Sequence, residues 1–448
     1  MRRRKSLISK GRATAVLAVI IIAVIVYAFL TFLEVSSPEG QWVNESSYIG
    51  RDGLISIKAS DSGTGLGSVE VLIKKGGKST QILFEDFSAK EPAIADFTDE
   101  IKPDFRKLGI KEGSAVLVLK VTDRSLWFSG NTHEVEYPVE IDTTPPRIGV
   151  ISRDHVVLQG GSEAVVFKSS PDTLRAVVKI EGHTFPAYRG AFEDDDKFLG
   201  LFSYPYDIKP GKPVQIEAVD AAGNSRVRSL EVLVKPYEYR KRRIGLSDKF
   251  LETKVADLLD AAYIPTTGDL LGDFLLVNKD LRARNEAKIA SVMETSTPEL
   301  LWKGRFLQLK NSAVQSRFAD FRTYVYKGRK VDKLYHLGVD LASVSKSTVG
   351  ASNNGVVVFA DDMGLYGNTV ILDHGFGLFS LYGHLSTIDV MEGDTVKKGA
   401  EIGRTGSTGF AGGDHLHFGL YLHGTPVLPL EWWDGRWIRN RIMKKMKE

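Results

Sequence analysis

Histidines gather near the C-terminal end of this chain of 448 residues. Five of its nine histidines lie between Tyr335 and Gly419, and these are His336, His374, His384, His415 and His417. Histidine is the commonest side-chain ligand for metals, and its neutral ring can take up a proton near neutral pH. This stretch is therefore where metal or acid–base chemistry is expected.

Two pairs of residues in this stretch have spacings that bring their side chains together. His336 and Asp340 are four residues apart, with Gly338 between them. They would share one face of a helix, or converge where glycine lets an extended chain turn. His415 and His417 are two residues apart in strand-like sequence, so both point to one face. Three nitrogen or oxygen donors with an open fourth position describe a catalytic zinc site.

Taken singly, each of these histidines is more simply interpreted as a hydrogen-bonded or surface residue. The two pairs together are hard to explain as core packing, because buried polar groups need partners. The chain has no cysteine, which excludes a thiolate zinc site, a disulfide scaffold and a cysteine nucleophile. The motif H-E-x-x-H is also absent, so no glutamate is marked as the base of a metalloprotease.

The order of these motifs resembles that of the lysostaphin/LytM-type zinc peptidases. The resemblance rests on H-x-x-x-D at residues 336–340, Tyr-x-His-Leu at 382–385 and H-x-H within Gly-Asp-His-Leu-His-Phe at 413–418. It extends from about Phe318 to Trp433 and includes a dense framework of glycines. The resemblance implies a β-rich endopeptidase domain that cuts the peptide part of bacterial peptidoglycan and binds one Zn²⁺ ion per chain.

The resemblance also implies a role for each motif residue. It makes His336, Asp340 and His417 the zinc ligands, and it makes His415 and His384 the catalytic pair that faces the bound water and the scissile carbonyl. Zinc held by two imidazoles and a carboxylate lowers the pKa of its water and polarises the carbonyl. The sequence leaves open which of His415 and His384 is the general base.

The chain departs from the family pattern at one position. Many relatives have arginine two residues before the first histidine, and here that position is Leu334. This leaves the local support of the ligand loop open, whereas the ligand set itself is complete. A complete set argues against the relatives that have lost ligands and activate other hydrolases. The alternative that we keep is a zinc-binding but catalytically silent scaffold or regulator of cell-wall hydrolases or division proteins.

The composition indicates a folded, multidomain protein. Hydrophobic residues make up 43% and charged residues 26% of the chain, which are ordinary values for globular proteins. Its length predicts two to four domains. The net charge of +3 is small for this length and gives no reason to expect nucleic acid as a partner.

The first 33 residues predict a membrane anchor. Residues 1–12 are basic, and residues 13–33 contain no charge, which is about the 20 residues needed to span a bilayer. A cleavable signal peptide would have a shorter apolar region ending in small residues, whereas this one ends Thr31-Phe32-Leu33. Because the cationic end should stay in the cytoplasm, we expect a single-pass protein of the cytoplasmic (inner) membrane. The remaining domains would then face the periplasmic or extracellular side.

Residues 34–145 and 146–236 predict two β-sandwich modules. Short alternating or β-branched runs recur at 69–73, 115–121, 135–141, 164–167 and 214–219. Two consecutive prolines at 145–146 mark the boundary, because they cannot join a strand ladder. The pattern resembles bacterial immunoglobulin-like modules, which commonly begin after such a Pro-Pro. We expect the modules to span distance or to bind cell-envelope proteins.

Residues 237–301 predict a helical connector. Ser247 can cap a first helix, and residues 281–293 have helical spacing with Asn278 as a candidate cap. Thr297-Pro298-Glu299 predicts a third helix start, with proline in the first turn. The connector would join the sandwiches to the peptidase domain.

Strand signals return in residues 302–435, which form the expected peptidase domain. The basic tail, residues 436–448, has Ile438, Ile442 and Met446 about one helical turn apart, and we interpret it as a solvated helix. The chain as a whole is therefore predicted to be mainly β.

Overall fold

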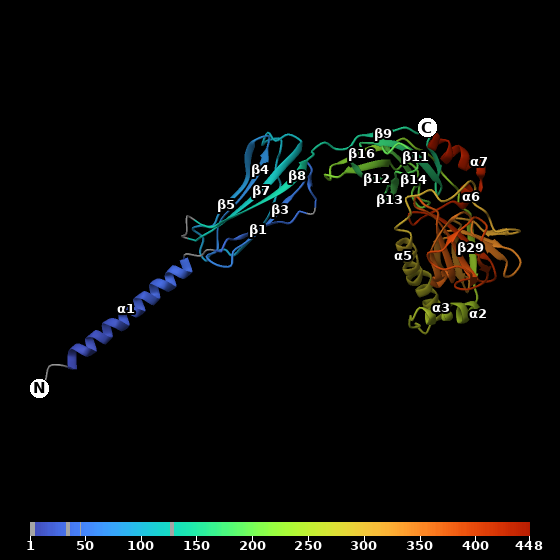
Figure 1. The fold of residues 1–448 in the computed structure, drawn as a ribbon. Helices are drawn as coiled ribbons and strands as arrows, with labels where there is room; N and C mark the ends of the chain where they lie inside the picture. Colours follow the sequence, from blue (N-terminus) through green and yellow to red (C-terminus); the bar gives the residue numbers. More distant parts are fainter. Residues whose placement is uncertain (1–4, 33–35, 45, 126–129) are drawn as a thin grey trace. The chain divides into compact units, whose positions relative to one another are not determined.

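The computed structural model describes residues 5–32, 36–44, 46–125 and 130–448. The chain forms two compact units, which we describe separately. One unit contains residues 1–145 with 219–224, and the other contains residues 146–218 with 225–448. Figure 1 shows that strands dominate both units, so the expectation of a mainly β chain is confirmed.

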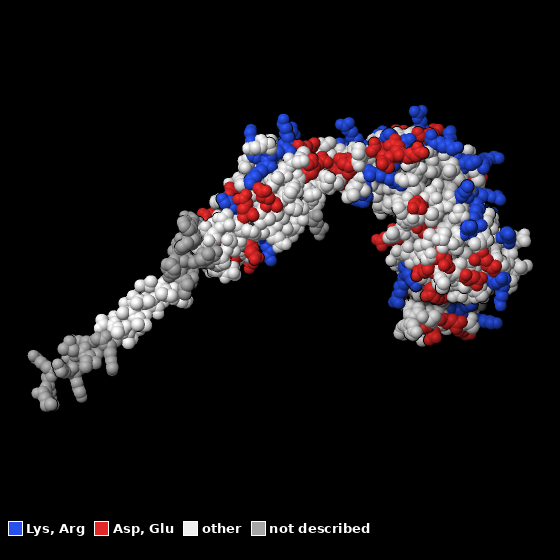
Figure 2. All heavy atoms as spheres, viewed as in Figure 1, with Lys and Arg blue, Asp and Glu red and all other residues white. Residues whose placement is uncertain are grey.

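A single long helix opens the first unit. Helix α1 covers Lys5–Phe32, and the side chains described in it, at residues 14–27, are all exposed and uncharged (Figure 2). Across the described residues, however, we find no helix that is both long enough and apolar enough to cross a bilayer. The membrane anchor at residues 13–33 therefore stays a prediction.

The first module consists of two mainly antiparallel sheets that share one core. The alternation of buried and half-buried residues along β4 places Val69, Val71 and Ile73 on one face. These residues belong to the same buried cluster as Ile55 and Ile57 of the other sheet, so the predicted two-layer packing is present. The three-stranded sheet contains β1 (Glu39–Trp42), β3 (Ile55–Ser60) and β6 (Asp96–Ile101). The five-stranded sheet contains β2 (Tyr48–Ile49), β8 (Thr132–Ile141), β7 (Gly113–Asp123), β4 (Leu66–Lys75) and β5 (Lys78–Asp86).

The second module has a different arrangement. Its strands join in one sheet of seven, because β13 pairs with both β12 and β14 and so connects the two halves. A short parallel ribbon of β10 and β17 completes it. The immunoglobulin-like character of both modules stays a prediction. The strands are β9 (Ile148–Val150), β10 (Val156–Leu158), β11 (Ser162–Ser169), β12 (Thr173–Ile180), β13 (His183–Tyr188), β14 (Lys197–Ser203), β15 (Val214–Asp220), β16 (Ser225–Leu230) and β17 (Leu233–Lys235).

The connector is helical, as expected, but it begins with a strand. The side chain of Ser247 caps the first helix by accepting a hydrogen bond from the backbone of Phe250. The second helical stretch is capped by Asp269, and Asn278 lies inside it. The elements are strand β18 (Lys241–Leu246), then α2 (Asp248–Phe250), η1 (Leu251–Val255), α3 (Ala256–Ala261), α4 (Leu270–Leu275), η2 (Leu276–Leu281) and α5 (Arg282–Val292).

The prediction of a third helix start at Thr297-Pro298-Glu299 is wrong. These residues are not helical, because their backbone groups bond to the peptidase domain instead. The amide of Thr297 donates to Asp373, and its carbonyl accepts from Phe376. A segment held in this way cannot close the hydrogen bonds of a helical turn.

The peptidase domain is built on a large antiparallel sheet that is covered on both faces. Along β25, Val370 and Leu372 point into the core shared with the second module, while Ile371 points into a core formed with the connector helices. The sheet strands are β19 (Ala313–Ser316), β22 (Val339–Ala342), β23 (Thr348–Gly350), β24 (Gly355–Asp362), β25 (Asn368–Asp373), β26 (Leu378–Ile388), β27 (Thr395–Val396), β28 (Glu401–Thr405), β29 (Leu416–Leu422) and β30 (Thr425–Val427), with the short helix η3 (Gly364–Tyr366). A separate three-stranded sheet orders β18, β20 (Phe321–Tyr326) and β21 (Arg329–Tyr335).

The C-terminal tail is helical, but the expectation that it is solvated is wrong. Ile438 and Ile442 are buried in the core that the second module shares with the peptidase domain. The ammonium group of Lys445 is also buried and pairs with Glu163 of β11 at 2.8 Å. The apolar spacing of the tail is therefore a packing face. The helical elements are α6 (Pro429–Trp433), α7 (Gly435–Ile438), η4 (Arg439–Met443) and η5 (Lys445–Lys447).

One buried carboxylate at this junction predicts a pH-dependent stability. Glu431 accepts a hydrogen bond from the backbone of Ser162 at 2.7 Å. Burial raises its pKa to about 8, and the nearby charge of Glu163 adds to the effect. Because the folded-state pKa is raised, the stability from this group is complete below about pH 4.5 and is lost as the pH rises through about 8.

We therefore expect Glu431→Gln to stabilise the protein relative to wild type at pH 9 by roughly 2–4 kcal/mol. The difference should shrink towards pH 5, where the wild-type carboxyl is already protonated in the fold. Thermal or denaturant unfolding of both proteins between pH 5 and 9 measures it. A difference that is the same at every pH would contradict the assignment.

Candidate metal centre

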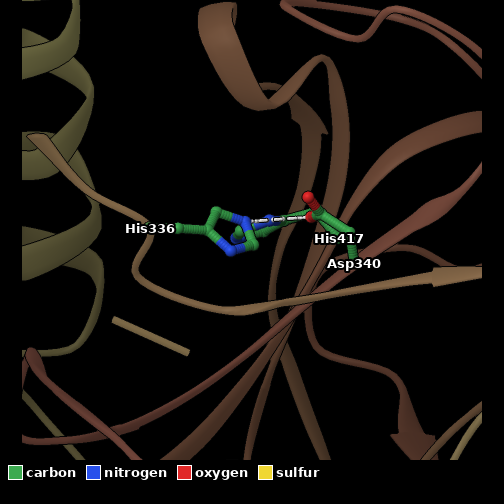
Figure 3. Close-up of side chains that lie close together, drawn as sticks. All are labelled: His336, Asp340 and His417. Carbon is green, nitrogen blue, oxygen red and sulfur yellow. Dashed lines mark hydrogen bonds and ion pairs between the residues drawn. The ribbon is translucent and has the colours of Figure 1, made fainter. Parts of the chain in front are cut away.

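The three side chains expected to be zinc ligands converge on one point (Figure 3). His336 follows the end of β21, and Asp340 of β22 lies directly opposite His417 of β29. Nε2 of His336 lies 2.9 Å from Oδ1 of Asp340 and 3.1 Å from Nδ1 of His417. That Nδ1 lies 3.0 Å from the same Oδ1. The fold thus brings together the three residues that we expected as metal ligands.

The donor set fits a zinc ion with an open position. His336, Asp340 and His417 are 5%, 8% and 4% exposed, and their donor atoms all lie within 4.8 Å of one another. Two imidazole nitrogens and one carboxylate oxygen are typical of catalytic zinc. Nε2 of His417 is buried and has no hydrogen-bond partner among the described residues, so its Nδ1 is the nitrogen that can bind a metal.

Gly338 explains why the first motif has glycine at its centre. A β-carbon at this position would lie 2.6 Å from Nε2 and Cε1 of the His417 ring, which is far inside van der Waals contact. Only glycine therefore lets the His336–Asp340 segment pass close enough for His336, Asp340 and His417 to meet.

The protonation states of Asp340 and His417 suit a metal. Burial would raise the pKa of the Asp340 carboxyl, but the charge of His336 and hydrogen bonds from His336 and His417 hold it well below its usual value. Burial lowers the pKa of His417 to about 4. At neutral pH the carboxylate is therefore anionic and the His417 ring neutral, which is the form that binds metals.

The two predicted catalytic histidines lie side by side at this centre. The rings of His384, in β26, and His415 have centroids 4.8 Å apart, and Nε2 of His415 lies 3.7 Å from Oδ1 of Asp340. Nδ1 of His384 donates to the carbonyl of Thr408 at 2.9 Å, and Nδ1 of His415 donates to that of Gly413 at 2.8 Å. The neutral form of either ring therefore carries its proton on Nδ1 and leaves Nε2 as an acceptor.

The environments of these two histidines differ. Burial, followed by the charges of His415 and His417, lowers the pKa of His384 well below its usual value. His384 also has a positive φ of 64°, a backbone conformation that is costly outside glycine and is typical of functional sites. The side chain of His415 is 17% exposed. His415 is therefore the member of the pair with more access to solvent.

A guanidinium that the sequence did not single out supports the ligand Asp340. Nη2 of Arg322, in β20, donates to Oδ2 of Asp340 at 2.9 Å, and the Arg322 side chain is 18% exposed. Arg322 lies directly opposite Leu334 in the ladder between β20 and β21. Position 334 has no arginine, but Arg322 on the neighbouring strand supplies a guanidinium at the same place. Because Arg322 bonds to Oδ2 of Asp340, Oδ1 remains available to a metal.

The centre opens into a cavity of about 380 Å³ whose wall is partly supplied by the connector. Residues 244–247 of β18 and its following turn line it, together with Phe250 of α2 and Arg282 of α5. Phe250 packs edge-on against Phe410 of the peptidase domain, with centroids 5.2 Å apart. No local motif marks these connector residues, because β18 joins β20 across a separation of about 80 residues.

The remaining histidines of the peptidase domain are structural. His374 is fully buried and bonds to the carbonyl of Asn354 and the hydroxyl of Ser380. His423 lies within hydrogen-bond distance of Tyr188 in the second module. The fold places neither residue at the candidate metal centre.

Comparison with known proteins supports the family resemblance. Residues 334–429 match Peptidase family M23. The DD-carboxypeptidase/endopeptidase Mpg of Neisseria meningitidis serogroup B is 42% identical over 95 residues, which are 21% of this chain and 22% of that protein. The peptidoglycan DD-endopeptidase ShyA of Vibrio cholerae is 40% identical over 92 residues, which are 20% of this chain and 21% of that protein. The chain thus spans about a fifth of the length of these relatives.

A solved structure is similar to part of the chain. The catalytic domain of lysostaphin from Staphylococcus simulans is 28% identical, with 29% of this chain and 98% of that chain covered and a TM-score of 0.26. The family match falls on the segment that carries His336, Asp340, His384, His415 and His417. The family match therefore shows that the C-terminal domain of this chain contains a LytM-type Peptidase family M23 domain.

Proposed function

We propose that the protein is a zinc-dependent endopeptidase that hydrolyses peptide bonds in bacterial peptidoglycan. The observation that carries the proposal is the convergence of His336, Asp340 and His417 on one point at the wall of an open cavity. The names of the relatives Mpg and ShyA support the substrate class. Release of muropeptides from purified peptidoglycan by the full chain, with loss of release on chelation, tests the proposal.

The residues around the metal would divide the chemistry among them. A bound zinc ion would supply a Lewis acid that polarises the scissile carbonyl and lowers the pKa of water. In the neutral ring of His415, Nδ1 bonds to Gly413, so Nε2 has no proton, and it lies 3.7 Å from Oδ1 of the ligand Asp340. His415 would therefore accept the proton of the attacking water. Burial keeps the ring of His384 neutral, so it would orient the water as an acceptor. Arg322 would keep Asp340 in place through Oδ2.

We also propose that α1 anchors the chain in the cytoplasmic membrane, with the peptidase domain on the outer side. The absence of charge in residues 13–33 and the exposed apolar side chains at residues 14–27 support this. The β-rich modules between α1 and the peptidase domain would then set its reach towards the wall or bind envelope proteins.

We expect His336→Ala and His417→Ala to abolish stoichiometric zinc binding, because each removes one of three protein donors. Metal analysis of the purified variants measures this. His133→Ala, in the first module, is the matched control and should keep one zinc per chain. Full zinc content in the two ligand variants would overturn the assignment.

His415→Ala should keep its zinc but lower the rate of muropeptide release by about 10²–10⁴-fold, since it removes the proton acceptor. Metal content and initial rates are measured side by side, with His384→Ala for comparison. A near-normal rate in His415→Ala, with the large loss in His384→Ala, would move the general base to His384. Zinc binding without any release by the wild type would favour a silent scaffold instead.

Arg322→Ala should weaken zinc affinity by about 10–100-fold, the range for loss of a group that orients a metal ligand. Competition with a chromogenic chelator gives the affinity. Residue 334 faces the same cavity from the opposite strand. Adding Leu334→Arg to Arg322→Ala should therefore restore part of the zinc affinity. Lys333→Ala removes an exposed charge from the same sheet and should change nothing. Wild-type affinity in Arg322→Ala would contradict the role.

A further inference from the structure

The connector places a positively charged side chain in the wall of the cavity at the candidate metal centre. The chemistry proposed above has no role for this side chain. Arg282, the first residue of α5, lines this cavity. Its Nε donates to the carbonyl of Asn278 at 3.2 Å and its Nη2 to the side-chain oxygen of Asn278 at 3.0 Å. Asn278 is 2% exposed and in turn donates to Asp332 of β21 at 2.8 Å. The guanidinium is therefore held in a fixed position by a buried neutral amide.

The charge of this guanidinium is not compensated within the cavity. In the part of the chain that the structure describes, no carboxylate oxygen lies within 4.0 Å of Arg282. Among the described residues that line the cavity, Asp340 is the only acidic one, and it is already paired with Arg322 and the histidines. Glu286, one turn further along α5, lies near enough for the charge of Arg282 to lower the pKa of its carboxyl, but burial raises that pKa by more, and Glu286 lines a separate cavity of about 190 Å³. A bound metal would make the Arg282 cavity more positive still.

Purely structural bonds do not account for the choice of arginine. The two bonds to Asn278 use two of the five guanidinium N–H groups, and the others remain available to a ligand. A guanidinium binds a carboxylate through two parallel hydrogen bonds, and in a partly desolvated site such bonds are strong. In a peptide substrate without phosphate, the anionic groups are carboxylates.

We propose that Arg282 binds a free carboxylate of the substrate, so that the enzyme prefers peptidoglycan peptides that carry an unblocked carboxylate next to the scissile bond. This inference rests on the proposed peptidase function and adds a specificity residue from outside residues 334–429. The connector therefore takes part in substrate selection as well as joining domains.

The test compares two substrates that differ only in charge. Cross-linked muropeptide dimers are used as isolated and after amidation of their stem-peptide carboxylates. For the wild-type protein, kcat/KM should be at least about tenfold higher on the free acid, as expected for a charge-assisted pair. Arg282→Gln should lose this preference through a rise in KM on the free acid and leave the rate on the amide unchanged. Arg282→Lys should retain part of the preference.

Arg284→Ala is the matched control, since Arg284 is exposed on the same helix and does not line the cavity. Zinc content and the unfolding temperature should be equal in all four proteins. Equal rates of the wild type on both substrates, or an equal loss on both substrates in Arg282→Gln, would overturn the inference.

The two proposals fail in different ways. If the wild-type protein releases nothing from either substrate, the peptidase function fails, and binding of the two dimers by calorimetry then decides the role of Arg282. Tighter binding of the free acid that is lost in Arg282→Gln would support the carboxylate site. Equal affinity of the wild type for both dimers would refute it.

Discussion

The metal centre depends on keeping one buried carboxylate anionic. Asp340 is 8% exposed, and a charge removed from water is costly unless it is paired and hydrogen-bonded. Arg322 satisfies Oδ2, while His336 and His417 approach Oδ1. These partners come from β20, from the loop after β21 and from β29, so the correct register of three separate segments is needed before the charge is compensated.

The C-terminal domain, which contains the family match and its flanking residues, is not a self-contained body in this chain. Its core continues into the second module, where the indole of Trp432 donates to Ser162 and Glu431 accepts from the backbone of the same residue. Its other face is covered by connector helices, and Phe274 packs there against Tyr324. The wall of the cavity at the candidate metal centre is therefore partly set by elements that lie before residue 334.

Local spacing explains what could be predicted from the sequence. In H-x-x-x-D, the turn at Gly338 brings the two side chains together. In H-x-H, the two-residue period of a strand does so. Each effect depends on only a few neighbouring residues, so it can be seen in the sequence. Arg322, Arg282 and β18 reach the site through pairings between distant segments, and their sequences have no distinguishing motif. The prediction of a solvated C-terminal tail was wrong for a related reason. The spacing of Ile438 and Ile442 defines an apolar face, but it does not show which surface that face packs against.

The crowding of donors itself argues for a cation at this centre. The carbonyl of Arg317 lies 3.1 Å from Nδ1 of His336 and can only accept, so in the neutral ring Nε2 carries a lone pair. That lone pair faces Nδ1 of His417 at 3.1 Å and Oδ1 of Asp340 at 2.9 Å. One proton on Nδ1 of His417 can satisfy only part of this set, and burial opposes a second proton, which would give that ring a charge. A divalent cation satisfies all three donors at once, which gives a physical reason why the fold brings them so close.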